Sequence, residues 1–234
     1  MNSEKFEITT DIILIDVVKY SLLANEEQLR AVEVIQFDLT KQIHFMAELT
    51  NLRNSEVVLG FVSTGDGLYV VVNPQICGYG IPLGFSIRNY LLWLSSHQKD
   101  ALYPGIRVAI HMGKCLSFTD VNGSRNYIGD GPNDCARLLS VRDDEAIRFC
   151  GDTNYVVASE AACGWFHELF QSQESERFLS TMKFKMSKQF HIVDKHKKIH
   201  RAHLVDGFRG AFIQPPNFLR PRKRAKLYQS GVLG

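Results

Sequence analysis

Apolar residues along the chain form short continuous runs that alternate with stripes at helical spacing. Asp11 to Val18 is an apolar, β-branched run of strand length with one acidic residue near its end. Between Glu26 and Leu49 the apolar residues recur at helical spacing, and Asn25 with Gln28 three residues later is typical of a helix N-terminus. The pattern predicts a strand followed by a long helix.

Two β-rich runs, Glu56 to Val62 and Leu68 to Val72, follow the long helix. The short connection S-T-G-D-G joins them, and its length and glycines are typical of a hairpin. The rest of the chain predicts a helix over Ile87 to Ser96 after a Gly/Pro-rich loop, strands over Ile106 to His111 and Lys114 to Phe118, a short helix over Asn133 to Val141, a strand over Tyr155 to Ala158, a helix over Glu160 to Phe170 and a closing hairpin over Gln189 to Val205.

The order strand, helix, hairpin, helix, strand is typical of a ferredoxin-like, split βαβ arrangement. We therefore expect an α+β fold, with a mostly antiparallel sheet and helices packed on one face. No internal repeat or domain linker is visible in the sequence. The chain is predicted to form one domain over residues 1–214, followed by a basic tail over residues 215–234 that begins at Pro215-Pro216.

Composition narrows the class of protein. The 234 residues are 45% apolar, which is ordinary for a globular protein with a real core, and the net charge of +2 does not point to nucleic acid. The five scattered cysteines indicate neither a disulfide framework nor a zinc site. The N-terminus resembles no export signal, and no apolar stretch reaches the ~20 residues of a membrane span. We expect a cytoplasmic protein with no nucleic-acid or membrane partner.

Two aspartates are candidates for metal ligands. Asp16 lies in the first apolar strand, where an unpaired carboxylate is costly, and Asp66 lies on the predicted hairpin tip. If the hairpin packs beside the first strand, the two carboxylates converge and could hold a hard divalent ion such as magnesium or manganese. The alternative is that Asp16 only ends a strand and Asp66 only stabilises a turn.

Other polar positions suit a phosphate-bearing ligand. The backbone that leaves the first strand through Tyr20 and Ser21 could present N–H groups to a phosphate. Arg107 begins an apolar strand and suits an anion or simply a solvated strand end. Asn133 and Arg137 are four residues apart on one helix face, a pair that suits charge on phosphate and ribose oxygens. An asparagine cap beside a surface arginine is the alternative.

Four motifs occur in order between Asp11 and Ser140: I-L-I-D-V-V-K-Y-S, S-T-G-D-G, G-I-R-V-A-I-H-M-G and I-G-D-G-P-N-D-C-A-R. The ordered set resembles class III nucleotidyl cyclases, the family of adenylyl and guanylyl cyclase catalytic domains. The resemblance implies that Asp16, Asp66 and the carbonyl of Val17 bind two ions, Mn²⁺ or Mg²⁺. It further implies in-line attack of the ribose 3′-hydroxyl on the α-phosphorus, with loss of pyrophosphate.

The same resemblance assigns the remaining site residues. Arg107 corresponds to the arginine that binds the triphosphate. Asn133 and Arg137 correspond to the pair that orients the ribose and stabilises the transition state. In the family the site lies across a dimer interface, so a homodimer with two composite sites is implied. Arg201 is the best match for a phosphate-binding lysine on the late strand, and Lys198 is its rival.

Two departures from the family pattern concern the base of the nucleotide. Val62, four residues before the hairpin aspartate, and Asn126, seven before the asparagine, replace the residues that read a purine in adenylyl and guanylyl cyclases. In this respect the chain is similar to the bacterial pyrimidine cyclases of Pycsar antiphage defence. UTP is the favoured substrate because an amide at Asn126 could read uracil as donor and acceptor. CTP or a purine nucleotide is the alternative.

Two readings from other classes compete with an enzyme. One is a catalytically silent nucleotide-binding module, and the other is an RNA-binding protein built on the related split βαβ sheet. No strand carries the aromatic motif of such RNA-binding sheets. The metal, triphosphate and ribose positions are all filled by the expected residue types, which favours an active enzyme.

Overall fold

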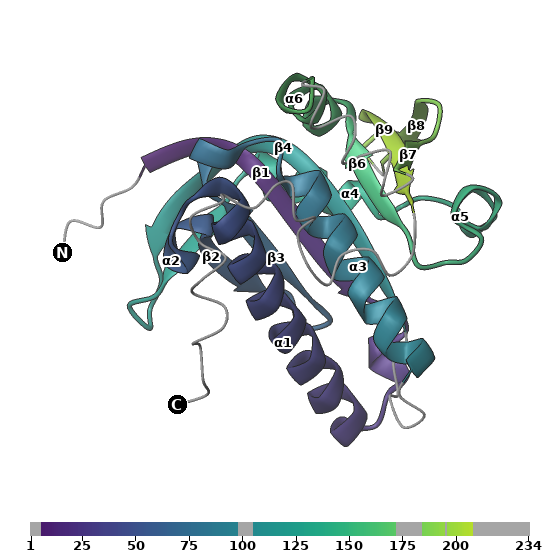
Figure 1. Cartoon of the computed structure of the whole chain (residues 1–234), viewed down its shortest axis with the longest axis horizontal. Helices are drawn as coiled ribbons and strands as arrows, with labels where there is room; N and C mark the ends of the chain where they lie inside the picture. The colour runs from purple at the N-terminus through teal and green to yellow at the C-terminus, as the bar shows by residue number, and fades with distance from the viewer. Residues whose placement is uncertain (1–5, 98–104, 172–183, 195, 208–234) are drawn as a thin grey trace.

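A computed structural model of the chain describes residues 6–97, 105–171, 184–194 and 196–207, which form one mixed sheet with helices against it (Figure 1). The described strands are β1 (Phe6–Val17), β2 (Val58–Ser63), β3 (Gly67–Val72), β4 (Ile106–Thr119), β5 (Arg125–Ile128), β6 (Val156–Ser159), β7 (Lys185–Met186), β8 (Phe190–Val193) and β9 (Ile199–Asp206). They follow the order β2-β3-β1-β4-β6-β9-β7, with β5 paired to β4 and β8 paired to β9. The predicted tail, residues 215–234, lies outside the described residues.

The helices of the described ranges are α1 (Asn25–Thr50), α2 (Asn54–Val57), α3 (Gly80–His97), α4 (Asp130–Leu138), α5 (Asp143–Cys150) and α6 (Glu160–Leu169). Short 3₁₀ turns lie at Tyr20–Leu22 and Pro74–Ile76. None of these helices combines the length and the apolar composition that crossing a membrane requires. The expected hairpins and the long first helix are confirmed, whereas α2, α5, β5 and β7 were not predicted.

The mostly antiparallel sheet is confirmed, because among the strand pairs that the structure describes only β4–β6 is parallel. β1 lies between β3 and β4 and is buried on both faces, which explains its continuous apolar run. Ile13 and Ile15 pack on one face of the sheet, and Ile12 and Leu14 pack on the other. A strand of this kind needs cover on both sides.

The expectation that the helices pack on one face is wrong. α1, α3 and α6 cover the first face, and Figure 1 shows α1 and α3 lying in front of β1. α4 and α5 cover the opposite face through buried residues such as Cys135, Leu138 and Ala146. The second face therefore has its own apolar core, and α4, which carries two candidate site residues, belongs to it.

β4 is one strand of 14 residues, where two strands around Met112-Gly113 were expected. Gly113 stays extended and pairs with Thr10, so the ladder with β1 continues through it. A Cβ at Gly113 would lie 2.9 Å from the Cα of Gly131 in α4. The glycine marks the close approach of a helix and not a turn.

Three helix starts also differ from prediction, and one of them is α4, which begins at Asp130 and not at Asn133. α3 begins at Gly80, inside the expected loop, because the buried Asp11 carboxylate accepts the N–H groups of Gly78 and Gly80 at 2.7 and 2.9 Å. Burial raises the pKa of Asp11 to about 6, although both hydrogen bonds oppose the rise. α1 is capped by Ala24, whose N–H donates to the Glu27 carboxylate, and not by Asn25.

Candidate active site

The β2–β3 hairpin places Asp66 beside the end of β1. Asp16 pairs with Gly67 in the β1–β3 ladder, and the Val17 N–H donates to the Asp66 carbonyl at 3.0 Å. A Cβ on Gly67 would overlap the carbonyl oxygen of Ile15, so only glycine lets the hairpin tip lie this close. The prediction that the hairpin packs beside the first strand is confirmed.

The Asp16 carboxylate is paired with an arginine side chain of the neighbouring strand β4. Arg107 is its partner in the β1–β4 ladder, and the guanidinium donates to Oδ2 of Asp16 through Nε, at 2.9 Å, and through Nη2. Burial raises the pKa of Asp16 above its usual value; the Arg107 hydrogen bonds oppose this rise and the nearby Asp66 carboxylate adds to it. The two aspartates are thus close enough to repel each other.

This arrangement fits a divalent cation. A pocket of about 140 Å³ at the hairpin tip is lined by Val17, Tyr20 and Asp66, among others. No cluster of three metal-ligating side chains occurs in the described ranges, so an ion here would need backbone, water or phosphate oxygens as well. Magnesium commonly binds in this way, with one or two carboxylates and the phosphates of its substrate. A cation would also relieve the repulsion between the two aspartates.

The chain leaves β1 through a tight turn. Lys19 has a φ of 57°, and Tyr20–Leu22 forms a 3₁₀ turn that carries Tyr20 and Ser21. The N–H groups of Val17 and Val18 donate to backbone carbonyls within the fold. Tyr20 and Ser21 therefore remain the candidates for backbone contacts to a phosphate.

α4 presents Asn133 and Arg137 on its outward side. Asn133 is exposed and Arg137 is partly exposed, whereas Cys135 and Leu138 are buried against the sheet. The Tyr69 hydroxyl of β3 donates to the Pro132 carbonyl at 3.0 Å and supports the start of the helix. Within the described ranges no hydrogen bond or ion pair joins Asn133 or Arg137 to the two aspartates.

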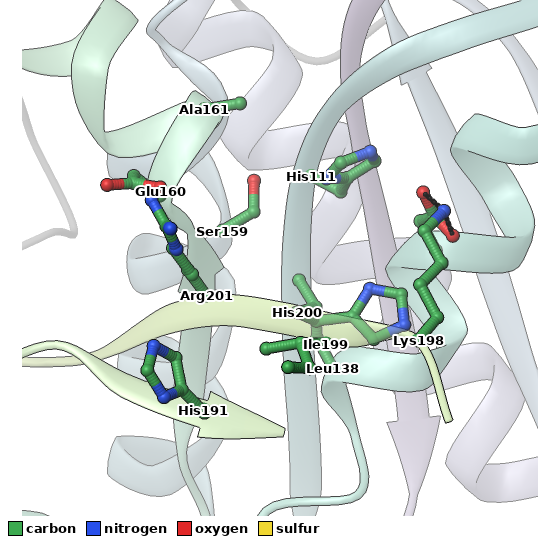
Figure 2. Close-up of a pocket in the computed structure, with 11 residues that line it drawn as sticks. His111, Leu138, Ser159, Glu160, Ala161, His191, Lys198, Ile199, His200 and Arg201 are labelled. Atoms are coloured by element: carbon green, nitrogen blue, oxygen red, sulfur yellow. Dashed lines mark hydrogen bonds and ion pairs between the residues drawn. The ribbon is translucent and has the colours of Figure 1, made fainter. Parts of the chain in front are cut away.

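The two candidates for the late phosphate-binding residue lie on opposite sides of a pocket of about 530 Å³ (Figure 2). Lys198 donates to both oxygens of Asp134 on α4, at 2.8 and 2.7 Å. Arg201 reaches Glu160 on α6 at 3.4 Å. Lys198 is therefore the one that lies beside the helix of Asn133 and Arg137. His111 lines the same pocket, and burial lowers its pKa.

The candidate base-reading residues lie on two strands that contact each other. The Tyr127 hydroxyl of β5 donates to the Leu59 carbonyl of β2 at 3.0 Å. Val62 is half-buried against the second apolar core. The side-chain oxygen of Asn126 accepts the Tyr127 N–H at 2.8 Å. This bond uses one lone pair of the oxygen and leaves the NH₂ group of Asn126 able to donate.

Comparisons with known proteins identify the fold. No protein-family model matches the sequence, and no curated protein matches it. The guanylate cyclase domain of RhGC from Catenaria anguillulae in complex with GTP has a TM-score of 0.56 and 12% identity, covering 87% of this chain and 98% of that one. The catalytic core of a rhodopsin-guanylyl cyclase with converted specificity, in complex with ATPαS, has a TM-score of 0.56 and 13% identity, and the match covers 87% of this chain and 99% of that one. The adenylyl cyclase CyaB from P. aeruginosa has a TM-score of 0.53 and 13% identity, and the match covers 88% of this chain and 98% of that one.

The chain has the fold of a class III nucleotidyl cyclase catalytic domain. Several residues of this cyclase fold that contact the candidate site carry no sequence signal. Tyr69 supports α4 from another strand, and Asp194 lies near Arg137 from the β8–β9 turn. For Asp134, the position between Asn133 and Arg137 is the one feature of the sequence that suggests a place in the site. These contacts join elements that are distant in sequence.

Proposed function

We propose that the chain is a nucleotide cyclase, which converts a nucleoside triphosphate to a 3′,5′-cyclic nucleotide and pyrophosphate. The observation that carries the proposal is the convergence of Asp16 and Asp66 opposite Arg107, in a fold shared with guanylyl and adenylyl cyclase domains. The reaction joins the ribose 3′-oxygen to the α-phosphorus and breaks the bond between the α-phosphorus and the oxygen that bridges to the β-phosphate, so that pyrophosphate leaves and the hydroxyl proton passes to solvent.

The residues of β1, β3 and β4 would hold the triphosphate end. Asp16, Asp66 and the Val17 carbonyl would bind two Mn²⁺ or Mg²⁺ ions, which supply charge neutralisation and a lowered pKa of the 3′-hydroxyl. Arg107 would turn from Asp16 to the phosphates, where its planar guanidinium can donate two hydrogen bonds. Tyr20 and Ser21 would add backbone N–H donors.

The outward residues of α4 would complete the site of a partner chain. Asn133 would hold the ribose and Arg137 would stabilise the charge that develops around the phosphorus. This division requires a homodimer with two composite sites. For the late phosphate contact we favour Lys198 over Arg201, because Lys198 lies against α4 while Arg201 reaches the other side of the pocket.

We propose UTP as the substrate and cyclic UMP as the product. The free NH₂ group of Asn126 suits a base that presents a carbonyl oxygen, as uracil does at O4, better than one that presents an amine there. The apolar Val62 offers no hydrogen bond to a purine edge. The motif resemblance to Pycsar cyclases supports a role for this product as a signal in bacterial antiphage defence.

The direct test is incubation of the purified chain with each of the four NTPs and Mn²⁺, followed by mass identification of the products. Cyclic UMP should form fastest. Equal or faster turnover of CTP, ATP or GTP would end the assignment to UTP. A chain that binds a nucleotide without converting any of them would be a silent binding module instead.

The substitution Asn126→Asp tests the role of the amide. A carboxylate at this position can only accept hydrogen bonds, so it should repel a carbonyl oxygen and attract an amine. We expect the kcat/KM ratio of UTP to CTP to fall by about 10-fold or more. Asn122→Asp, in the turn that precedes β5, is the control and should leave the ratio unchanged. An unchanged ratio in Asn126→Asp would remove this residue from base recognition.

A further inference from the structure

The turn between β8 and β9 is organised by one buried carboxylate. Oδ1 of Asp194 accepts the N–H groups of His196 and Lys198 at 2.8 and 2.9 Å. Oδ2 accepts from Nε2 of His200 at 3.2 Å. The side chain is only 5% exposed. Burial works against its charge, but the hydrogen bonds from His200 and the turn hold the pKa of Asp194 below its usual value.

This turn is joined to α4 by two ion pairs of opposite direction. Oδ2 of Asp194 lies 3.9 Å from Nε of Arg137, so the turn supplies the acid and the helix supplies the base. Lys198 and Asp134 make the reverse pair at 2.7 Å. The first pair is the more sheltered, because the side chain of Asp194 is 5% exposed whereas that of Lys198 is more than half exposed. Sheltered pairs are screened less by solvent and salt.

We propose that Asp194 is a positioning residue, which holds the guanidinium of Arg137 by its Nε edge in the orientation that catalysis requires. The inference rests on the cyclase function proposed above. A carboxylate at the Nε edge leaves the two terminal NH₂ groups of the arginine free for a substrate oxygen. An arginine side chain otherwise loses rotamer entropy when it is ordered. Holding it in advance moves that cost out of the reaction step.

The chain contains a matched control for this role. Asp120 organises the β4–β5 turn with the same pattern, since its Oδ1 accepts the N–H groups two and four residues later at 2.9 and 3.0 Å. The backbone bonds of the two turns also correspond, and the fourth residue has a positive φ in each, Gly123 in one and Lys197 in the other. Asp120 makes no ion pair within the described residues. The two turns therefore share the contacts of Oδ1 and differ in those of Oδ2, which lies near Arg137 and His200 in the Asp194 turn.

The test compares Asp194→Asn with Asp120→Asn. Asparagine keeps a side-chain oxygen for the turn but presents an NH₂ group to Arg137 and to His200, so the two contacts of Oδ2 are lost and the turn bonds of Oδ1 are kept. With UTP and Mn²⁺, kcat of Asp194→Asn should fall at least about 10-fold while KM stays within about 3-fold. Asp120→Asn should keep kcat within about 2-fold. Equal losses in the two variants, or a loss confined to KM, would overturn the proposal.

A readout that needs no turnover is the Nε–H signal of Arg137 in ¹H–¹⁵N NMR, assigned by its disappearance in Arg137→Lys. Its chemical shift should be the same in the unmodified chain and in Asp120→Asn, and should move in Asp194→Asn, where the neighbouring charge is removed. An unchanged signal in Asp194→Asn contradicts the positioning role whatever the activity. If the unmodified chain converts no NTP, the cyclase proposal fails, while this signal still decides whether Asp194 orients Arg137.

Discussion

The tripeptide Gly-Asp-Gly forms two turns of this molecule, at residues 65–67 and 129–131, and both use their glycines in the same way. The first glycine has a positive φ, 92° in one turn and 128° in the other. The second glycine lies where a Cβ would strike a neighbouring backbone carbonyl, that of Ile15 or that of Lys114. Each turn therefore closes the chain tightly onto a central strand of the sheet.

The surroundings of the two turns differ. Asp66 points into the neighbourhood of a second carboxylate, Asp16, and the chain then continues as a strand. Asp130 opens α4, whose outward side carries Asn133 and Arg137. The comparison teaches that a short motif specifies a backbone shape. The chemistry of its aspartate depends on the side chains that the rest of the fold brings beside it.

The largest expected effect separates the two aspartates. Asp66→Ala removes a proposed metal ligand and should lower kcat/KM for UTP at least about 1,000-fold. Asp130→Ala removes a carboxylate with no proposed role and should stay within about 3-fold. Turnover with Mn²⁺ is the measurement, and gel filtration checks that both variants keep the assembly of the unmodified chain. Comparable activity in Asp66→Ala would remove the metal assignment.

A mixing experiment tests whether the two turns serve one site in two chains. Asp66→Ala and Arg137→Ala should each be inactive alone. In a 1:1 mixture half of the dimers are mixed, and each mixed dimer has one intact site, so about a quarter of the unmodified activity should return.

Recovery requires subunit exchange, so the two variants are refolded or expressed together. A mixture of Asp66→Ala with an Asp66→Ala, Arg137→Ala double variant is the control, because no combination of these chains contains an intact site. Recovery in the control, or none in the test mixture, would contradict a composite site.

Local patterns predicted much of the fold. The hairpin around Asp66 was predictable because strand alternation and turn glycines lie within a dozen residues. The single long β4 was not, since Gly113 resembles a turn residue until α4 is packed against it. The second helical layer was missed for a related reason. The apolar residues of α4 and α5 are few, and the need to cover β1 on both faces appears only with the whole sheet.

The candidate site was predicted to a similar extent. Asp16 and Asp66 could be placed together because one ladder, β1 with β3, joins their strands. The choice between Lys198 and Arg201 could not be made from the sequence, because Lys198 lies in the turn before β9 and Arg201 within the strand, and only the packing shows which of them reaches α4. Asp194 carried no signal, since its contact with Arg137 joins residues more than fifty positions apart.

The glycines give the smallest effects and the closest test of the comparison. Gly67→Ala and Gly131→Ala would force a Cβ into a backbone carbonyl that cannot move without disturbing the sheet. Each should lower the free energy of unfolding by about 2–4 kcal/mol in urea denaturation. Gly164→Ala, on α6 with open space around its Cα, is the control and should be neutral or slightly stabilising. A neutral Gly67→Ala or Gly131→Ala would show that the approach to the strand is not tight.

The first glycines should distinguish the two turns from each other. Gly129 has φ 128° and ψ −168°, a region that residues with a Cβ essentially do not occupy, whereas Gly65 has φ 92° and open space around its Cα. Gly129→Ala should therefore cost about 2–3 kcal/mol of unfolding free energy and Gly65→Ala about 1 kcal/mol. Because Gly129 precedes the helix of Asn133 and Arg137, its variant should also lose kcat. Equal costs would mean that the two turns share their backbone strain as well as their sequence.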